Sequence, residues 1–180
     1  MANRAYLLAV DDHSVVRSQA PKKEVIAEGI NEIPIFWAAL FSAEDRQVDA
    51  LPGSEVKIPN WCVKSGTAKQ RLQTLREPIG RLLDERSRGI WHQFVEHLSA
   101  EEATYFKTNA AEVWGMDPGG YEPYCSKLLA PFESPTAPAL KAAVEANELR
   151  YTDGAVSWDR KDETICKLAG ADHIRAVPWL

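Results

Sequence analysis

The sequence predicts an α+β fold: a helix-rich single domain with a long kinked central helix and short strands or hairpins near both ends. Three observations predict it. Apolar side chains in residues 67–98 recur at steps of three, four and seven, the period of an amphipathic helix. Short runs that favour strands lie near both termini: 4–10 is brief and mostly apolar, and 150–159 has β-leaning pieces on either side of Asp153-Gly154. With 180 residues, 45% of them apolar, the chain can bury one sizeable core. We therefore expect one domain, 1–180, with an internal linker near 131–138.

The first third of the chain predicts a strand and a buried helix. Residues 4–10 are brief and mostly apolar, which indicates a strand, whereas 23–33 fits a strand or a helical turn equally well. Residues 33–42, IPIFWAALFS, predict a short helix with Pro34 at its first position, where the missing N–H costs nothing. Its apolar side chains point almost all round, so we expect Trp37 in the core.

The middle of the chain predicts β-structure followed by the long helix. Residues 43–53 are acidic and then turn-like, and 55–64 predicts a hairpin or two edge strands because Pro59 interrupts it. The helix over 67–98 should kink at Pro78, or else divide into two helices that meet near Gly89.

The second half predicts three further helices and a hairpin. Ser99 and Glu102 have the spacing of a capping box, which predicts a helix over 99–115. Shorter helices are expected at 121–132 and 137–149. Asp153-Gly154 between two β-leaning pieces predicts a hairpin over 150–159, and a last strand is expected at 173–177.

The net charge of −5 is distributed unevenly. Residues 1–99 hold 13 basic and 13 acidic side chains, whereas residues 100–180 hold 8 basic and 13 acidic. An acidic surface repels phosphates, so we expect no nucleic acid partner. It suits a basic protein partner, although ordinary solubility also accounts for a modest net charge.

The motifs of common catalytic and metal sites are missing from the sequence. His92 and His97 are five residues apart, which is not the spacing of a metal pair on a helix, and no two cysteines form a CxxC. There is no GxSxG, GxGxxG or GxxxxGK[ST]. We therefore expect no metal, no cofactor and no catalysis. Three widely spaced cysteines favour reduced thiols over a disulfide framework.

The start of the chain and its hydropathy bear on location. MANRAYLLAVDDH lacks the basic, apolar and cleavage-site order of a signal peptide, which favours the cytoplasm. No run of about 18 apolar residues occurs, so we expect no transmembrane span and no membrane partner.

The opening MANRAYL, followed by EIPIFWAALFSA, resembles a group of small bacterial cytoplasmic proteins that share a MANR-[S/A]-YL start. Members of this group often resemble immunity proteins encoded beside secreted antibacterial toxins. The resemblance covers mainly residues 1–43, and this chain has Ala5 where Ser is the commoner form. It implies kinship with immunity proteins, and it transfers no functional residue.

The resemblance and the acidic carboxyl half together predict an immunity protein that binds a cognate toxin or effector domain and blocks its active site. A tryptophan ringed by acidic residues is a reasonable hot-spot layout, which makes the hairpin and the residues after it the expected contact surface. Its residues are Asp153, Trp158, Asp159, Asp162 and Glu163. Two alternatives stay open: a small enzyme or ligand-binding domain with a site near the long helix, and a subunit that only assembles with another protein.

Overall fold

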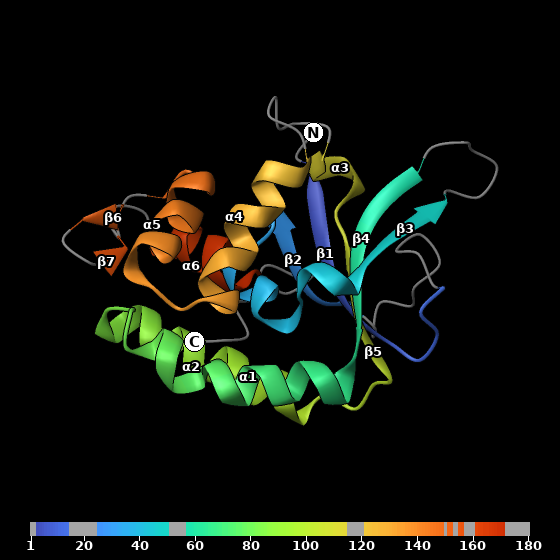
Figure 1. Ribbon diagram of the computed structural model, residues 1–180, viewed down its shortest axis with the longest axis horizontal. Helices are drawn as coiled ribbons and strands as arrows, with labels where there is room; N and C mark the ends of the chain where they lie inside the picture. The colour runs from blue at the N-terminus through green and yellow to red at the C-terminus, as the bar shows by residue number, and fades with distance from the viewer. Residues whose placement is uncertain are drawn as a thin grey trace.

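A five-stranded antiparallel sheet forms the frame of the molecule, in the order β2-β1-β5-β4-β3 (Figure 1). The structure is a computed structural model that describes residues 3–14, 25–50, 57–114, 121–149, 151–152, 155–156 and 161–171. The strands are β1 (Arg4–Val10), β2 (Val25–Ile30), β3 (Arg46–Ala50), β4 (Lys57–Lys64) and β5 (Tyr105–Asn109). The fold is therefore α+β, as the sequence predicts.

Strand β1 pairs with a neighbour at each edge, and its apolar side chains bury both of its faces. Leu7 and Leu8 point to opposite faces of the sheet, and both are completely buried. Leu7 lies opposite Ala27 of β2 and Thr108 of β5. The segment 23–33, which fitted two secondary structures, contains β2.

The predicted short helix is the hub of the core. It forms the 3₁₀ helix η2 (Ile35–Leu40), preceded by Pro34 as its N-cap residue, and all six of its side chains are buried. Helix η2 contacts the three helices α1, α4 and α6. The burial predicted for Trp37 is confirmed, since its side chain is inaccessible to solvent.

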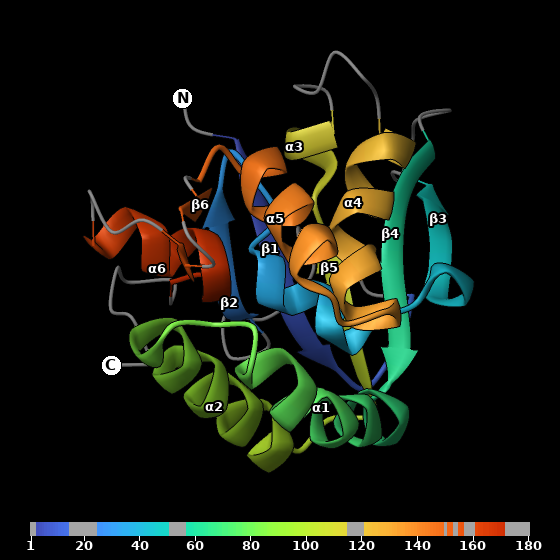
Figure 2. The same cartoon turned by 60° about the vertical axis from the view of Figure 1, so that its left-hand side comes forward.

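The region 67–98 forms two helices rather than one kinked helix. They are α1 (Ser65–Gly80) and α2 (Glu85–Ala100), which pack on each other along one end of the sheet (Figure 2). Pro78 lies inside α1, and the chain turns at 81–84 instead of at Gly89. The Asp84 side chain caps α2 by accepting a 2.7 Å hydrogen bond from Ser87 N.

Side-chain bonds hold this turn and the helix pair together. Arg88 donates from Nε to the Gly80 carbonyl at 2.7 Å, and from Nη2 to the Leu83 carbonyl at 3.0 Å. The indole of Trp91 donates to the Arg76 carbonyl at 2.9 Å. Side chains of α2 thus donate hydrogen bonds to backbone carbonyls at the end of α1 and in the turn that follows it. Carbonyls at a helix end lack partners within the helix, and these bonds supply them.

The predicted helix over 99–115 is wrong. Ser99 belongs to the last turn of α2, and residues 105–109 form β5, the central strand of the sheet. Among the described residues of that stretch that follow α2, only α3 (Ala111–Trp114) is helical. The short apolar run Tyr105-Phe106 is compatible with both helical and strand periodicity. It forms a strand because it pairs with β1 and β4.

The region 43–64 contains more β-structure than expected. After the short 3₁₀ turn η3 (Ala43–Asp45), strand β3 forms the edge of the sheet and pairs with β4, with Pro59 opposite Val48. Strand β4 is continuous through Pro59, and it pairs with β5 only at Cys62–Lys64. Pro59 therefore lies outside the part of β4 that has strands on both sides.

The carboxyl half adds helices to the face of the sheet that carries the core. These are α4 (Tyr121–Glu133), α5 (Ala137–Ala146) and α6 (Lys161–Ala169). The predicted linker near 131–138 falls largely within the ends of α4 and α5, which pack together. Strands β6 (Tyr151–Thr152) and β7 (Ala155–Val156) pair around the Asp153-Gly154 position. The strand expected at 173–177 lies outside the described residues.

Two findings concern thiols and membranes. Cys62, Cys125 and Cys166 form no disulfide bond with one another, and the first two are buried. Among the helices in the described part of the chain, none combines the length and the apolar character needed to cross a bilayer.

Candidate functional site

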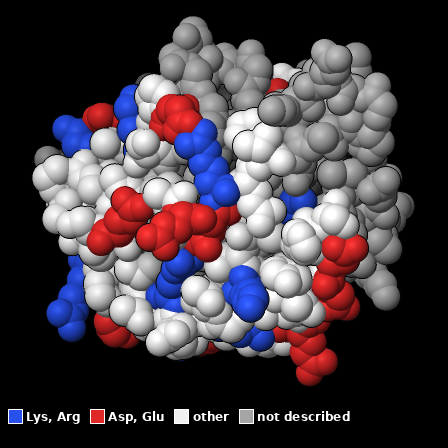
Figure 3. All heavy atoms as spheres, turned by 45° about the vertical axis from the view of Figure 1, so that its right-hand side comes forward, with Lys and Arg blue, Asp and Glu red and all other residues white. Residues whose placement is uncertain are grey.

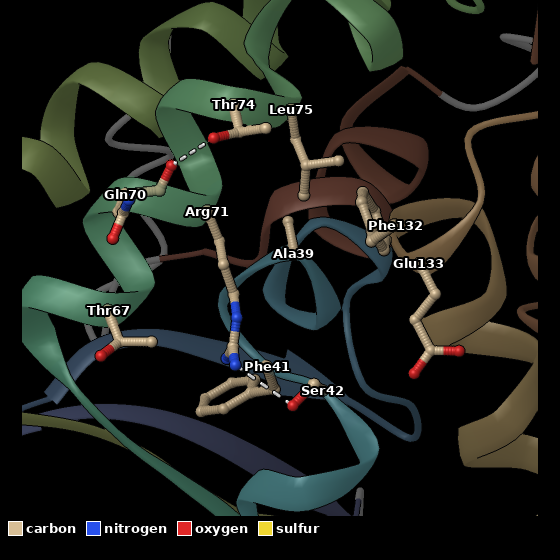
Figure 4. A pocket seen from close by; sticks show the side chains of 10 residues that line it. All are labelled: Ala39, Phe41, Ser42, Thr67, Gln70, Arg71, Thr74, Leu75, Phe132 and Glu133. Carbon is tan, nitrogen blue, oxygen red and sulfur yellow. Dashed lines mark hydrogen bonds between the residues drawn. The ribbon is translucent and has the colours of Figure 1, made fainter.

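A pocket of about 400 Å³ lies where α1, the end of η2 and the end of α4 meet (Figure 4). Its floor is apolar and consists of buried parts of the core, namely Ala39, Phe41, Leu75 and Phe132. These side chains come from three elements whose positions are set by η2. The pocket is therefore a feature of the tertiary packing.

Arg71 forms one wall of the pocket by reaching from α1 toward the chain that follows η2 (Figure 4). Its guanidinium donates from Nη1 to the Leu40 carbonyl at 3.1 Å and from Nη2 to Ser42 Oγ at 3.2 Å. Nη1 also forms an ion pair with Asp45 Oδ2. The guanidinium is held in place, and its charge is balanced within the protein.

The Asp45 carboxylate is also fixed by several hydrogen bonds. Its Oδ2 accepts hydrogen bonds from the Ser42 backbone N–H at 2.8 Å and from Ser42 Oγ at 2.9 Å, in the capping box of η3. The Asp45 side chain is 16% exposed. The Arg71–Asp45 ion pair thus links α1 to the residue directly before β3.

The rim of the pocket is polar and open to solvent. Thr67, Gln70 and Thr74 lie on the exposed side of α1, and Glu133 lies at the end of α4. Thr74 Oγ1 donates to the Gln70 carbonyl at 3.0 Å. Figure 4 shows Glu133 and Arg71 on opposite sides of the pocket, with Ala39 between them. Binding pockets are typically lined by apolar side chains with a few polar or charged groups, and this pocket has that composition.

The opposite face of the sheet carries a second polar cluster. Lys107 of β5 is completely buried, and its Nζ donates to the His13 carbonyl at 2.8 Å. The His13 ring lies 5.6 Å from the ring of Tyr105, measured between centroids. Next to it, the Ser14 backbone N–H donates to Asp12 Oδ1 at 2.8 Å, which lowers the pKa of Asp12 below its ordinary value of 3.8. The side chain of Ser14 and the charges of His13 and Lys107 act in the same direction.

The predicted contact residues lie at the margin of what the structure describes. Asp153, Trp158 and Asp159 are outside the described residues. Asp162 and Glu163 belong to the first turn of α6, where only the backbone is described. Their mutual arrangement therefore stays a prediction.

Sequence reasoning missed the pocket. In the sequence, Arg71 is one of several basic residues spread over 67–98, and Glu133 precedes a proline-rich stretch. No spacing relates these two residues, because they come from different helices. The one usable signal was the unusually hydrophobic decamer 33–42, whose end supplies part of the floor.

Metal ligands do not gather in the described ranges. No group of three or more His, Cys, Asp or Glu side chains there has the arrangement of a metal site. His92 is partly buried, and its Nε2 has no hydrogen-bond partner within the described part of the chain.

No family model, curated protein or solved structure matches the chain.

Proposed function

We propose that this protein is an immunity protein that binds a cognate antibacterial toxin in the bacterial cytoplasm and blocks its active site or substrate entry. It would use no metal or cofactor and carry out no catalysis. The observation that supports this proposal is the surface charge of the carboxyl half. Within the described residues 101–114 and 121–149, the exposed acidic side chains are Glu102, Glu112, Glu122, Glu133, Glu145 and Glu148.

Glu122 forms an ion pair with Arg46, and Glu145 Oε1 lies 3.8 Å from Lys141 Nζ, but few other basic side chains balance these acidic residues. In the same two ranges, Lys127 and Lys141 are the exposed basic residues, whereas Lys107 is buried. On the face drawn in Figure 3, acidic side chains form a row across the described surface, with basic side chains above and below it. The excess of exposed carboxylates favours a basic partner over an acidic one.

A toxin that acts on nucleic acids or nucleotides has this complementary character, because such enzymes have basic clefts. The same carboxylates repel nucleic acid itself and anionic membrane surfaces, so neither is proposed as a partner. Resemblance of residues 1–43 to proteins related to immunity proteins supports the same class of function.

The proposed contact surface is the hairpin and the residues that follow it: Asp153, Trp158, Asp159, Asp162 and Glu163. A buried aromatic anchor governs dissociation, whereas charges at the rim of an interface mainly govern association and its salt dependence. Trp158 and the acidic residues should therefore affect different rate constants.

The experiment is a kinetic binding assay with the product of the adjacent toxin-like reading frame as ligand. Replacing Asp159, Asp162 and Glu163 by lysine together should slow association and flatten its salt dependence. Trp158→Ala should speed dissociation by a factor equivalent to about 2 kcal/mol or more. Glu77→Lys, an exposed change on α1 outside the carboxyl half, is the control for a general effect of charge. No binding by the wild-type protein to the neighbouring product contradicts the proposal.

A second candidate function is a small-ligand site near the 67–98 segment, in an enzyme or a binding domain. The observation that favours it is the pocket, which α1 lines with residues 67, 70, 71, 74 and 75. Native mass spectrometry of freshly purified protein separates the two candidates. A stoichiometric small molecule that is lost on unfolding would favour the second.

A further inference from the structure

We propose that the pocket between α1, η2 and α4 receives an arginine or lysine side chain of the protein partner, with Glu133 as the carboxylate that meets its charge. This inference rests on the proposed function and adds a second contact region to it. The inference is based on the apolar floor of the pocket and the exposed carboxylate beside it.

The charge of the pocket is set by Glu133. Arg71 is the basic residue in the lining, and its guanidinium is bound to Asp45, Ser42 and the Leu40 carbonyl. The Arg71–Asp45 pair is therefore neutral as a unit. Among the residues that the structure describes, Glu133 has no ion-pair or hydrogen-bonding partner, so a cation is the favoured guest.

The floor suits the stem of a long basic side chain. Arginine and lysine bury their methylene groups along apolar surfaces while the charged head stays near water. Ala39, Phe41, Leu75 and Phe132 provide that surface, and the exposed Glu133 lies across the pocket from Arg71 (Figure 4). A guest whose stem lies on the floor would keep its head within reach of the carboxylate.

The open rim favours a side chain of a protein over an enclosed small molecule. Thr67, Gln70, Thr74 and Glu133 are all exposed, so the rim of the pocket is open to solvent. Small-ligand sites usually bury most of the ligand surface, which this site does not offer. Glu133 also belongs to the set of exposed carboxylates of the carboxyl half, so the pocket continues the surface that favours a basic partner.

The first test uses a matched pair of probes that needs no toxin. N-acetyl-arginine amide and N-acetyl-citrulline amide have nearly the same shape, and only the first carries a charge. In NMR titrations of the whole chain, the arginine probe should shift the amide signals of Thr67–Leu75 and Phe132–Glu133 in a saturable way. It should bind about threefold more tightly than the citrulline probe, the scale of an exposed ion pair.

Variants show whether the probe occupies this pocket. Glu133→Gln should remove the preference for arginine over citrulline, whereas Glu145→Gln, an exposed change outside the pocket, should keep it. Thr67→Trp fills the pocket from an exposed position of α1 and should abolish the shifts. Equal binding of both probes to the wild type, shifts elsewhere in the chain, or tighter binding of N-acetyl-glutamate amide overturns the inference.

The second test uses the toxin complex. If the wild type binds the neighbouring product, Thr67→Trp should weaken binding at least about tenfold and Glu133→Gln about threefold. Unchanged affinity for both variants overturns the pocket inference while the immunity function stands. If the arginine probe binds in a Glu133-dependent way but the neighbouring product does not bind, the immunity function fails, and the pocket keeps its assigned preference for a basic side chain.

Discussion

The indole Nε1–H of Trp37 donates a 2.8 Å hydrogen bond to the backbone carbonyl of Ala169. This bond joins η2, near the start of the chain, to the last residue of α6. Both residues are completely buried, so the bond is shielded from water. Gly170 follows directly, and its backbone bends there to let residue 171 pair with Glu28 of β2.

Replacing Trp37 by alanine should lower the free energy of unfolding by about 3–5 kcal/mol, because a buried aromatic side chain leaves a cavity. Trp37→Phe should cost less, since the ring stays buried and only the bond to Ala169 is lost. Urea denaturation of both variants measures the difference. A loss below about 1 kcal/mol for Trp37→Ala, the scale of a surface change, would contradict the burial of η2.

Gly170→Ala should destabilise the protein, whereas Gly89→Ala should stabilise it. Gly170 has φ +84°, and a Cβ there would lie 2.9 Å from Trp37 Cζ2. Gly89 is inside α2, and a Cβ added to it meets nothing within 4 Å. Alanine at that position should add about 0.5–1 kcal/mol through its higher helix propensity. Thermal unfolding of the two variants should shift Tm in opposite directions, and a rise for both would contradict the close approach at Gly170.

Tyr124→Phe should cost about 1–3 kcal/mol, because it leaves buried polar groups without a partner. The Tyr124 hydroxyl accepts from the Ile33 N–H at 3.0 Å and donates to Asn147 Oδ1 at 2.9 Å. Asn147 Nδ2 donates in turn to the Ile33 carbonyl at 2.8 Å. Chemical denaturation is the measurement, with Tyr105→Phe on β5 as the control, expected within about 0.5 kcal/mol of wild type. A loss below about 0.5 kcal/mol for Tyr124→Phe, the scale of the control, would contradict a contribution from the buried network.

Asp12 should titrate below its ordinary pKa of 3.8 in the folded protein, because the Ser14 backbone N–H bonds its carboxylate. A depressed pKa in the folded state contributes stability above the unfolded value, and this contribution is lost as pH falls through the folded value. Stability should therefore fall more steeply below pH 3.8 in the wild type than in Asp12→Asn.

NMR titration of the Asp12 carboxyl carbon tests this directly. Ser14→Ala should raise the pKa of Asp12 only partly toward its ordinary value, since the backbone bond remains when the hydroxyl is removed. A full return to the ordinary value in that variant would show that the side chain, rather than the backbone, is the main cause.

Local patterns were enough to predict several elements of the fold. Residues 4–10 form β1, and the decamer 33–42 contains a helix buried on all sides. Helix α4 matches the expected 121–132 within one residue, whereas α5 begins at the expected residue 137 but ends at 146 rather than 149. In each of these elements, periodicity and the adjoining turn or cap residues agree on one structure. The positions of the charged residues in the sequence also establish that the two halves differ in net charge.

Tertiary contacts decided the central strand and the pocket. The sequence around Phe106 fits a helix as well as a strand, and only the partners on β1 and β4 make it β5, with Lys107 buried on the face opposite the main core. The 67–98 segment divides at 81–84 because Asp84 caps α2 and Arg88 binds the end of α1. Arg71 and Glu133 line one pocket because α1 and α4 both pack against η2. Their closeness could not be predicted from local sequence patterns, since it depends on how two separate helices pack.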